Sequence, residues 1–276
     1  MPELPEVETE RTRLAAKLDG RKLASVEIAD PRLTRPEDPT IVAAMLEGDR
    51  VESVDRRGKY IVVRLASGRA LLVHLRMTGG FRDEPASHER ATFTLDDGTR
   101  IVYRDLRRFG TWALLEPDEA EEHLAVRVGP EPLERGFTTR FLAERLAGRK
   151  APVKAAILDQ RTVAGLGNIY ADEALWRAQI DPRREAGSLT SVEIAALRDG
   201  VRKALRTGIR YQGADLGDGA YAGGRMQERF RVYGRAGLPC ERCGTPIERT
   251  VIAGRGSWFC PTCQVAGRSR SPRSSE

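Results

Sequence analysis

The sequence lacks any stretch of about eighteen consecutive apolar residues, and it has no signal-peptide pattern at its start. It therefore predicts neither a membrane span nor export. Only four cysteines and three histidines occur in 276 residues, and no internal repeat is present. Because His74, His88 and His123 are scattered, they predict no metal cluster beyond the one that the cysteines suggest.

The four cysteines lie in two pairs toward the end of the chain. Cys240-x2-Cys243 and Cys260-x2-Cys263 are separated by sixteen residues, which is a zinc-ribbon spacing. Four thiolates around one Zn²⁺ form a closed, structural site with no open position for a substrate. Disulfides are the alternative, but they need an oxidising compartment, for which the sequence shows no export signal.

Length and charge limit the possible organisation and partners. A chain of 276 residues exceeds what one core usually covers, so two domains plus a small metal module are expected. Residues 1–130 carry 21 basic and 24 acidic residues, and residues 131–276 carry 25 and 16. The net charge is thus −3 in the first part and +9 in the second. A basic half and a sequence pI near 9.3 favour a polyanionic partner.

The first 130 residues predict a helix followed by antiparallel strands. Pro5 suits a first helical turn, Val7, Leu14 and Leu18 share one face, and Gly20 ends the helix. Short β-branched runs then occur at 23–28, 60–65, 71–75, 92–95, 100–103 and 111–115. Turn signals at 66–69 and 96–98 predict hairpins between several of them. The fold class is therefore α+β, with an antiparallel β-sandwich or barrel rather than a parallel sheet.

A Gly-Pro-rich boundary at 128–132 separates this region from a helical one. We predict a helix over 138–146, and a second that begins with a Thr190–Glu193 capping box and stops at Gly208. The domain prediction is 1–130 for a β-sandwich domain, 131–230 for a helical domain and 231–265 for the zinc ribbon. Residues 266–276, rich in serine and arginine, are predicted to be a disordered basic tail.

The first residues form a candidate nucleophile. Removal of Met1 would expose the secondary amine of Pro2 beside Glu3 and Glu6. An α-amino group has a pKa of about 8 against about 10.4 for lysine, and the positive end of the following helix lowers it further. Such an amine can attack a sugar carbon without first being buried. The alternative interpretation is that this segment is only a helix entry.

A glycine-interrupted segment, 165–173, runs into a helix at Asn168. Backbone N–H groups and the positive helix end at such a junction suit a phosphate. A glycine-rich helix hairpin that serves packing alone fits the pattern equally well.

Six segments in a fixed order identify a resemblance. They are 2–6 (Pro-Glu-Leu-Pro-Glu), 57–60, 74–79, 105–110, the helix-two-turn-helix at 165–173, and 253–256 in the ribbon. Together they resemble bacterial formamidopyrimidine-DNA glycosylases, bifunctional repair enzymes that remove oxidised purines. The resemblance covers nearly the whole chain.

The resemblance implies catalytic roles. Pro2 would attack C1′ of the damaged nucleotide to form a Schiff base, Glu3 would protonate the opening sugar ring, and Glu6 would support the N-terminal geometry. Lys59 matches the family lysine proposed for β-elimination, and Arg255 the residue linked to δ-elimination. One structural Zn²⁺ would then be the scaffold that carries Arg255.

The resemblance also implies a DNA interface. Met77, Arg107 and Phe109 match the trio that enters the helix when the damaged nucleotide is turned out. The phosphate contacts that it suggests are Arg108, Lys154, Asn168, Arg149, Lys150 and His88. The partner would be double-stranded DNA with oxidised or abasic sites, bound by a monomer that is cytoplasmic and associated with the nucleoid.

Three departures from the family pattern affect what is expected. Leu106 replaces a common proline and Arg76 a common glycine, so the inserting loops should differ slightly. The segment 213–224 is shorter and richer in glycine than the family's base-covering loop, which leaves the preference for 8-oxoguanine over ring-opened purines open. The alternatives are an endonuclease VIII-like enzyme for oxidised pyrimidines and a zinc-ribbon DNA-binding protein without chemistry.

Overall fold

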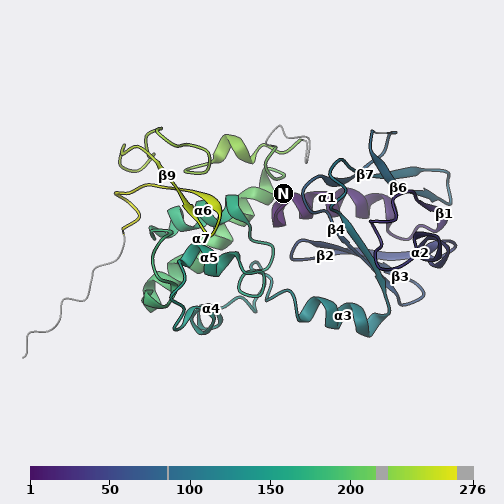
Figure 1. The fold of residues 1–276 in the computed structure, drawn as a ribbon, viewed down its shortest axis with the longest axis horizontal. Helices are drawn as coiled ribbons and strands as arrows, with labels where there is room; N and C mark the ends of the chain where they lie inside the picture. Colours follow the sequence, from purple (N-terminus) through teal and green to yellow (C-terminus); the bar gives the residue numbers. More distant parts are fainter. Residues whose placement is uncertain (86, 216–222, 266–276) are drawn as a thin grey trace, which may run out of the picture. The chain divides into compact units, whose positions relative to one another are not determined.

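The computed structural model describes residues 1–85, 87–215 and 223–265, and its chain divides into two compact units (Figure 1). The first comprises Met1–Glu131, Val163–Gly165 and Leu205–Arg229. The second comprises Pro132–Thr162, Leu166–Ala204 and the residues from Phe230 onward. Two short segments from the second half of the sequence therefore belong to the first unit. The predicted tail at 266–276 lies outside the described residues.

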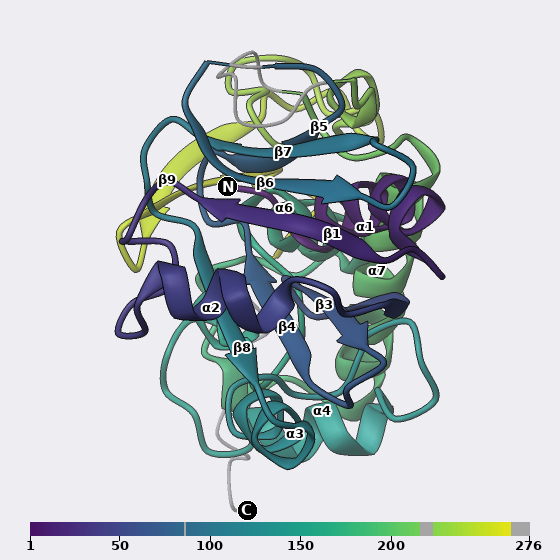
Figure 2. The same ribbon diagram turned by 90° about the vertical axis from the view of Figure 1, so that its right-hand side faces the viewer.

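The first unit is built on two four-stranded antiparallel sheets with the orders β1-β6-β7-β5 and β2-β3-β4-β8. Figure 2 shows the two groups of strands. The strands are β1 (Leu23–Ile28), β2 (Val51–Arg57), β3 (Tyr60–Leu65), β4 (Ala70–His74), β5 (Gly79–Arg82), β6 (Glu89–Leu95), β7 (Arg100–Asp105) and β8 (Thr111–Leu115). Both predicted hairpins are present, joining β3 to β4 and β6 to β7. The predicted antiparallel sandwich is confirmed.

One apolar core joins both sheets to the helices of the first unit. Helix α1 (Leu4–Leu18) contributes the predicted face, Val7, Leu14 and Leu18, and α2 (Pro39–Leu46) packs against β1. Helix α3 (Pro117–Ala125) covers a second, smaller apolar cluster beside β4. The main core thus fixes α1, and with it the N-terminal segment, against the sheets.

The second unit contains the remaining helices and a two-stranded ribbon. Its elements are α4 (Thr139–Leu146), α5 (Val153–Leu158), α6 (Asn168–Ala178), the larger part of α7 (Ser191–Arg210), β9 (Glu248–Ile252) and β10 (Arg255–Phe259). Two short 3₁₀ turns, Ala186–Ser188 and Met226–Arg229, complete the elements of the described chain.

The helix predicted from Thr190 is present, but its predicted end is wrong. The capping box is formed, since Glu193 N donates to Thr190 Oγ1 at 3.3 Å and Thr190 N donates to Glu193 Oε2 at 2.8 Å. The helix nevertheless continues through Gly208 to Arg210. A glycine inside a helix costs only about 1 kcal/mol relative to alanine, which the buried face of this long helix can offset.

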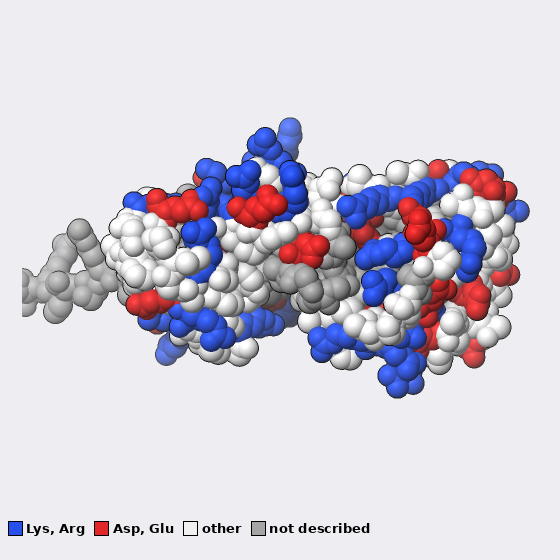
Figure 3. Space-filling view, turned by 90° about the horizontal axis from the view of Figure 1, so that it is seen from above, with Lys and Arg blue, Asp and Glu red and all other residues white. Residues whose placement is uncertain are grey.

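None of the helices in the described part of the chain is long and apolar enough to cross a membrane. Lys and Arg side chains are spread over the face that Figure 3 shows, with Asp and Glu among them. Within each unit the cations therefore lie among acidic groups, and individual cations must be judged by their partners.

Candidate active site and nucleic-acid interface

The start of the chain is held by backbone hydrogen bonds and one carboxylate. Glu3 is the N-cap of α1, and its N–H donates to Glu6 Oε2 at 2.9 Å. Leu4 N donates to Gly165 O at 2.9 Å, and Ala214 N donates to Glu6 Oε1 at 2.7 Å. Pro2, Glu3 and Glu6 are all buried. Glu6 therefore fixes both the N-terminal turn and the segment that begins at Gly213.

Gly165 and Gly213 are required by close approach to these residues. Both have positive φ, +74° and +78°. A Cβ at Gly165 would lie 2.6 Å from Leu4 Cβ, and one at Gly213 would lie 2.7 Å from Glu6 Cγ. A side chain at Gly165 would displace Leu4 and one at Gly213 would displace the Glu6 side chain, so both glycines help to place the candidate nucleophile.

Lys59 lies in a two-residue turn that joins β2 to β3. Gly58 takes φ +58°, and its N–H donates to the buried Glu131 carboxylate at 2.5 Å. Arg56 Nη2 donates to Glu131 Oε2 at 2.7 Å, and Arg56 Nε donates to Oε2 of Glu8 on α1 at 2.9 Å. Because these contacts brace the turn from both sides, Lys59 is carried on a rigid support tied to α1.

His74 stands next to this turn and remains neutral. It is buried, it pairs with Tyr60 edge to face at 4.9 Å between ring centres, and its Nδ1 accepts from Arg76 N at 3.0 Å. Burial, together with the positive charges of Arg76 and Lys59, lowers the pKa of His74 to about 3. The imidazole acts as a hydrogen-bond acceptor that supports the start of the Met77 loop.

Two loops of the first unit carry the three residues predicted to enter DNA. Met77 follows β4 and is half-buried, whereas Arg107 and Phe109 follow β7 and are exposed. Gly79 pairs with Asp105 in the β5–β7 ladder, so the two loops emerge side by side. The guanidinium of Arg107 lies 4.9 Å from the centre of the Phe109 ring, whose residue is 50% exposed. The structure thus presents these groups together, at the surface.

Asp105 connects the two loops. Its Oδ1 accepts from the Thr78 hydroxyl and from Arg107 N, the latter at 3.2 Å, and its Oδ2 accepts from Gly110 N at 2.7 Å. Thr78 Oγ1 also accepts from Arg107 N at 3.0 Å. A single buried carboxylate therefore sets the position of both loops, a role that the sequence did not reveal.

Tyr103 lies beneath both loops. A Cβ at Gly79 or at Gly110 would collide with its hydroxyl. The ring is fully buried and packs against Phe81 and Trp112, at 5.1 and 5.3 Å between ring centres. These edge-to-face contacts beneath the loops make the loop bases rigid even though their tips are exposed.

The predicted phosphate contacts have different surroundings. Arg108 makes two hydrogen bonds to Asp30, at 2.6 and 2.8 Å, and Arg149 lies 3.8 Å from Asp159. Lys150 and His88 are exposed. Arg108 thus has its Nη1 donors left for a phosphate, and Arg149 makes no hydrogen bond to Asp159 at this distance.

Lys154 does not fit its predicted role. Its side chain is fully buried, with Nζ 2.7 Å from Asp172 Oδ1, 2.7 Å from Ser257 Oγ and 2.8 Å from Gly256 O. A group enclosed in this way presents no surface to a phosphate. Lys154 instead joins α5 and α6 to strand β10, the strand that begins with Arg255.

The hairpin that carries Arg255 is a two-residue turn fastened to α6. Ala253 and Gly254 both have positive φ, as this tight turn requires. Asn168 Nδ2 donates to Gly256 O at 3.0 Å, and Trp258 N donates to Asp172 Oδ2 at 3.1 Å. Arg255 itself is exposed. Asn168 thus serves to position this hairpin, whatever contact it makes with DNA.

The four cysteines form the predicted metal site. Their Sγ atoms all lie within 4.8 Å of one another, with Cys240–Cys263 at 4.0 Å and Cys243–Cys260 at 3.5 Å. Tetrahedral Zn–S bonds of about 2.3 Å require sulfur atoms about 3.8 Å apart, so the set fits one zinc ion. Trp176 Nε1 donates to Cys240 Sγ at 3.5 Å and ties the site to α6.

A buried N-terminal turn, two adjacent loops that expose Arg107 and Phe109, a helical unit and a four-cysteine ribbon are the arrangement of a DNA glycosylase of the zinc-finger type. Three family models cover most of the chain: "Formamidopyrimidine-DNA glycosylase N-terminal domain" at residues 1–112, "Formamidopyrimidine-DNA glycosylase H2TH domain" at 128–218 and "Zinc finger found in FPG and IleRS" at 237–265. The chain belongs to the formamidopyrimidine-DNA glycosylase family, and it is a DNA glycosylase with lyase activity at abasic sites.

Individual relatives agree with this assignment. The chain is 46% identical to the formamidopyrimidine-DNA glycosylase of Symbiobacterium thermophilum, over 99% of this chain and 93% of that protein. It is 44% identical to the crystal structure of MutM from Thermus thermophilus, with a TM-score of 0.87 and coverage of 97% and 100%. A Lactococcus lactis Fpg mutant bound to Fapy-dG-containing DNA is 36% identical, with a TM-score of 0.89 and coverage of 95% and 99%.

Proposed function

We propose that this chain excises 8-oxoguanine and formamidopyrimidines from double-stranded DNA and cuts the resulting abasic site on both sides, with Pro2 as the nucleophile. The braced N-terminal turn carries this proposal, because Glu3, Glu6 and Gly165 hold the residue after Met1 at the start of α1. Relatives support the substrate class, since one MutM structure contains carbocyclic 8-oxo-G in DNA.

The reaction follows from an amine and a nearby carboxyl. After removal of Met1, the Pro2 nitrogen attacks C1′, the bond from C1′ to the base breaks, and the base leaves with a proton. Glu3 supplies a proton to the ring oxygen O4′, which opens the sugar and gives an iminium ion. Loss of a C2′ proton then expels the 3′ phosphate, and a second elimination expels the 5′ phosphate.

Lys59 and Arg255 serve these eliminations. We propose that Lys59 interacts with a phosphate oxygen and delivers a proton during β-elimination, and that Arg255 promotes the δ step. The rigid turn around Lys59 and the fastened hairpin around Arg255 support both roles, because a hydrogen bond holds the backbone of the residue next to each cation. Zinc supplies no chemistry and holds the ribbon.

Turning the nucleotide out of the helix requires groups that fill the gap. We propose that Met77 and Phe109 stack in the duplex and that Arg107 donates to the base left without its partner. Unstacking costs a few kcal/mol. A rigid base under both loops lowers the entropy that must be lost on insertion. Arg108, Arg149, Lys150, His88 and the start of α6 at Asn168 contact phosphates and read no sequence.

The same proposal assigns the parts of the chain. Residues 1–130 form the catalytic β-sandwich domain, 131–230 the helix-two-turn-helix domain, 231–265 the zinc ribbon and 266–276 a basic tail. The protein acts as a monomer in the cytoplasm, associated with the nucleoid. The resemblance implies that the segment 213–224 is the base-covering loop, and residues 216–222 of it lie outside the described residues.

Excision assays on matched duplexes test the proposal. We expect release of 8-oxoguanine and strand cutting at both phosphates, and much slower release of thymine glycol. Pro2→Gly should lose excision but keep duplex binding, and Arg255→Ala should lose the second elimination but keep its zinc. Thymine glycol excised in preference to 8-oxoguanine would favour the oxidised-pyrimidine class. Loss of zinc from Arg255→Ala would make that arginine structural.

A further inference from the structure

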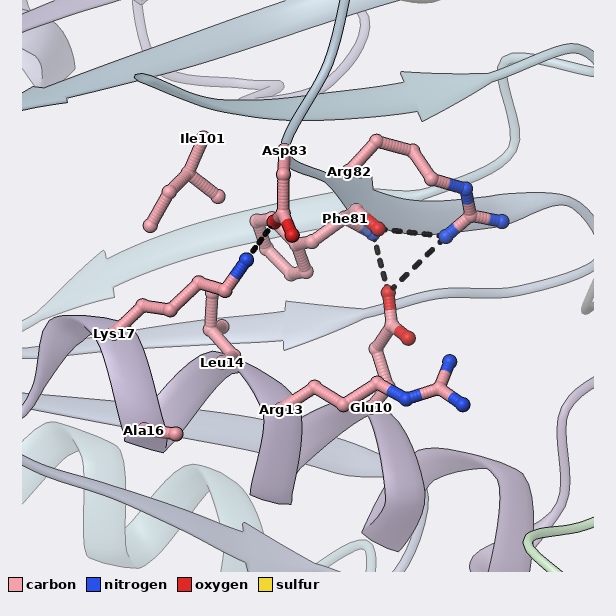
Figure 4. Close-up of a pocket in the computed structure, with 9 residues that line it drawn as sticks. All are labelled: Glu10, Arg13, Leu14, Ala16, Lys17, Phe81, Arg82, Asp83 and Ile101. Carbon is pink, nitrogen blue, oxygen red and sulfur yellow. Dashed lines mark hydrogen bonds and ion pairs between the residues drawn. The ribbon is translucent and has the colours of Figure 1, made fainter. Parts of the chain in front are cut away.

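A cavity of about 520 Å³ in the first unit lies beside the second half of α1 (Figure 4). Helix α1 forms one side, and β5 with β7 forms the other. Leu14, Phe81 and Ile101 give it apolar walls. Its volume is within the range of small-molecule sites, about 300–1,000 Å³.

Glu10 is the buried polar group of this cavity. The residue is 3% exposed, and its Oε1 accepts a hydrogen bond from Phe81 N. The guanidinium of Arg82 approaches the same oxygen at 3.7 Å. Within the described ranges, Oε2 receives no hydrogen bond, so both of its lone pairs can accept hydrogen bonds from a ligand. Burial raises the pKa of Glu10, which is the expected behaviour of a carboxyl group that lacks enough donors.

The cationic side chains around the cavity differ in whether an acidic group of the protein pairs with them. Lys17 forms an ion pair with Asp83, and Arg82 faces Glu10. Arg13 is exposed and has neither a hydrogen-bond nor an ion-pair partner in the described part of the chain. The cavity therefore combines a buried acceptor, apolar walls and one unpaired guanidinium at its rim.

We propose that this cavity binds a guanine-type purine ring, as the free base or as a nucleotide, with Glu10 accepting its N–H groups and Arg13 binding its anionic substituent. The Watson–Crick edge of guanine carries two adjacent donors, N1–H and the N2 amino group, and the two lone pairs of Glu10 Oε2 can accept from both. Adenine offers one donor and one acceptor at that edge, and the acceptor would face the carboxylate. The apolar walls suit a flat ring.

The cavity lies close to residues of the proposed repair site, so a ligand bound in it can affect the repair reaction. Glu10 follows Glu6 by one helical turn, and a Cβ on Gly223 would lie 3.5 Å from Arg13 Nη2. Ala214, at the other end of the 213–224 segment, donates to Glu6. A ligand that engages Arg13 therefore acts beside the end of the segment proposed to cover the damaged base. This inference rests on the proposed function. The ligand is either the oxidised base that the reaction releases or a free guanine nucleotide.

Calorimetric titration of the zinc-loaded full chain tests the site with GMP, AMP, guanosine and 8-oxoguanine. We expect GMP to bind at one site and AMP to bind about tenfold more weakly, since one hydrogen bond to a charged group is lost. Glu10→Gln should weaken GMP binding about tenfold and remove the preference over AMP. Arg64→Gln, an exposed cation on β3 of the other sheet, is the control and should change neither.

The Arg13→Ala variant distinguishes the two candidate ligands, the released oxidised base and a free guanine nucleotide. This exposed residue can be changed without disturbing the fold, so it keeps the test valid even if Glu10→Gln is unstable. It should weaken GMP about tenfold and leave guanosine and 8-oxoguanine unchanged. Tighter binding of 8-oxoguanine than of GMP by the unaltered chain identifies the released base as the ligand.

Equal binding of GMP and AMP, or GMP binding that is unaffected by both substitutions, overturns the inference. The Pro2→Gly chain should bind GMP as tightly as the unaltered chain, because the cavity does not include Pro2. If excision activity is absent while Glu10-dependent GMP binding persists, the proposed function fails and the site stands.

Discussion

Replacing Asp105 by asparagine should loosen both inserting loops at once. In the structure its two oxygens accept from Thr78, Arg107 N and Gly110 N. An asparagine can present only one acceptor oxygen, so its amide group must face one of these buried donors. An unsatisfied buried donor costs about 1–3 kcal/mol, and the lost charge adds to this, so we expect about 3 kcal/mol less stability.

The assay combines urea unfolding with a 2-aminopurine placed opposite the damaged base, whose fluorescence reports opening of the duplex. We expect Asp105→Asn to unfold at lower urea and to open 8-oxoguanine duplexes at least about tenfold more slowly, since a deficit of 1.4 kcal/mol in positioning already gives that factor. Schiff-base formation at a preformed abasic site should fall much less. Asp97→Asn, an exposed turn carboxylate that accepts from Thr99 N, is the control. Unchanged opening by Asp105→Asn would refute the assigned role.

Three further results are expected. Lys154→Met leaves Asp172 buried and unpaired and should cost about 3–5 kcal/mol in urea unfolding, whereas adding Asp172→Leu should recover much of it; additive losses would contradict the pairing. His74 has a folded pKa of about 3 against about 6.5 unfolded, so the unfolded chain binds more protons between these values and stability falls as pH drops from 6.5 toward 3. By pH 5 the loss of unfolding free energy amounts to about 2 kcal/mol. The His74→Asn variant, which keeps an acceptor for Arg76 N, should lose this pH dependence of stability. If its stability still falls with pH to the same extent, another group is titrating. Chelation of zinc should abolish strand cutting and release the ribbon from Trp176, with recovery on adding Zn²⁺; full activity of the zinc-free chain would contradict a structural metal.

The predictable parts of this fold are those whose local pattern matches their final environment. The strands at 23–28, 60–65 and 111–115 were predicted with the bounds that the structure has, because β-branched and apolar residues dominate them. Strand β2 was missed because its exposed and half-buried positions are mostly charged, and β5 because it begins with two glycines. Both are determined by their neighbours in the sheets.

The site shows the same division between local and distant causes. The cysteine ligands follow from spacing alone, and the N-terminal segment stands out because a proline follows the initial methionine. Glu131, Asp105 and Asp172 act mainly through partners 18 to 86 residues away in the sequence, and Asp105 also has short-range contacts within its own loop. Lys154 was assigned to phosphate for the same reason, since nothing near it in the sequence indicates that it is buried.

The central claim is that the nitrogen of Pro2 forms the covalent intermediate. Borohydride reduction during reaction with an 8-oxoguanine duplex, followed by mass spectrometry of the trapped peptide, tests it most directly. The account predicts a one-to-one adduct on a peptide that begins at Pro2, absent from Pro2→Gly and from chains that keep Met1. An adduct on Lys59 or on any other residue, or active protein that never yields an adduct, would contradict it.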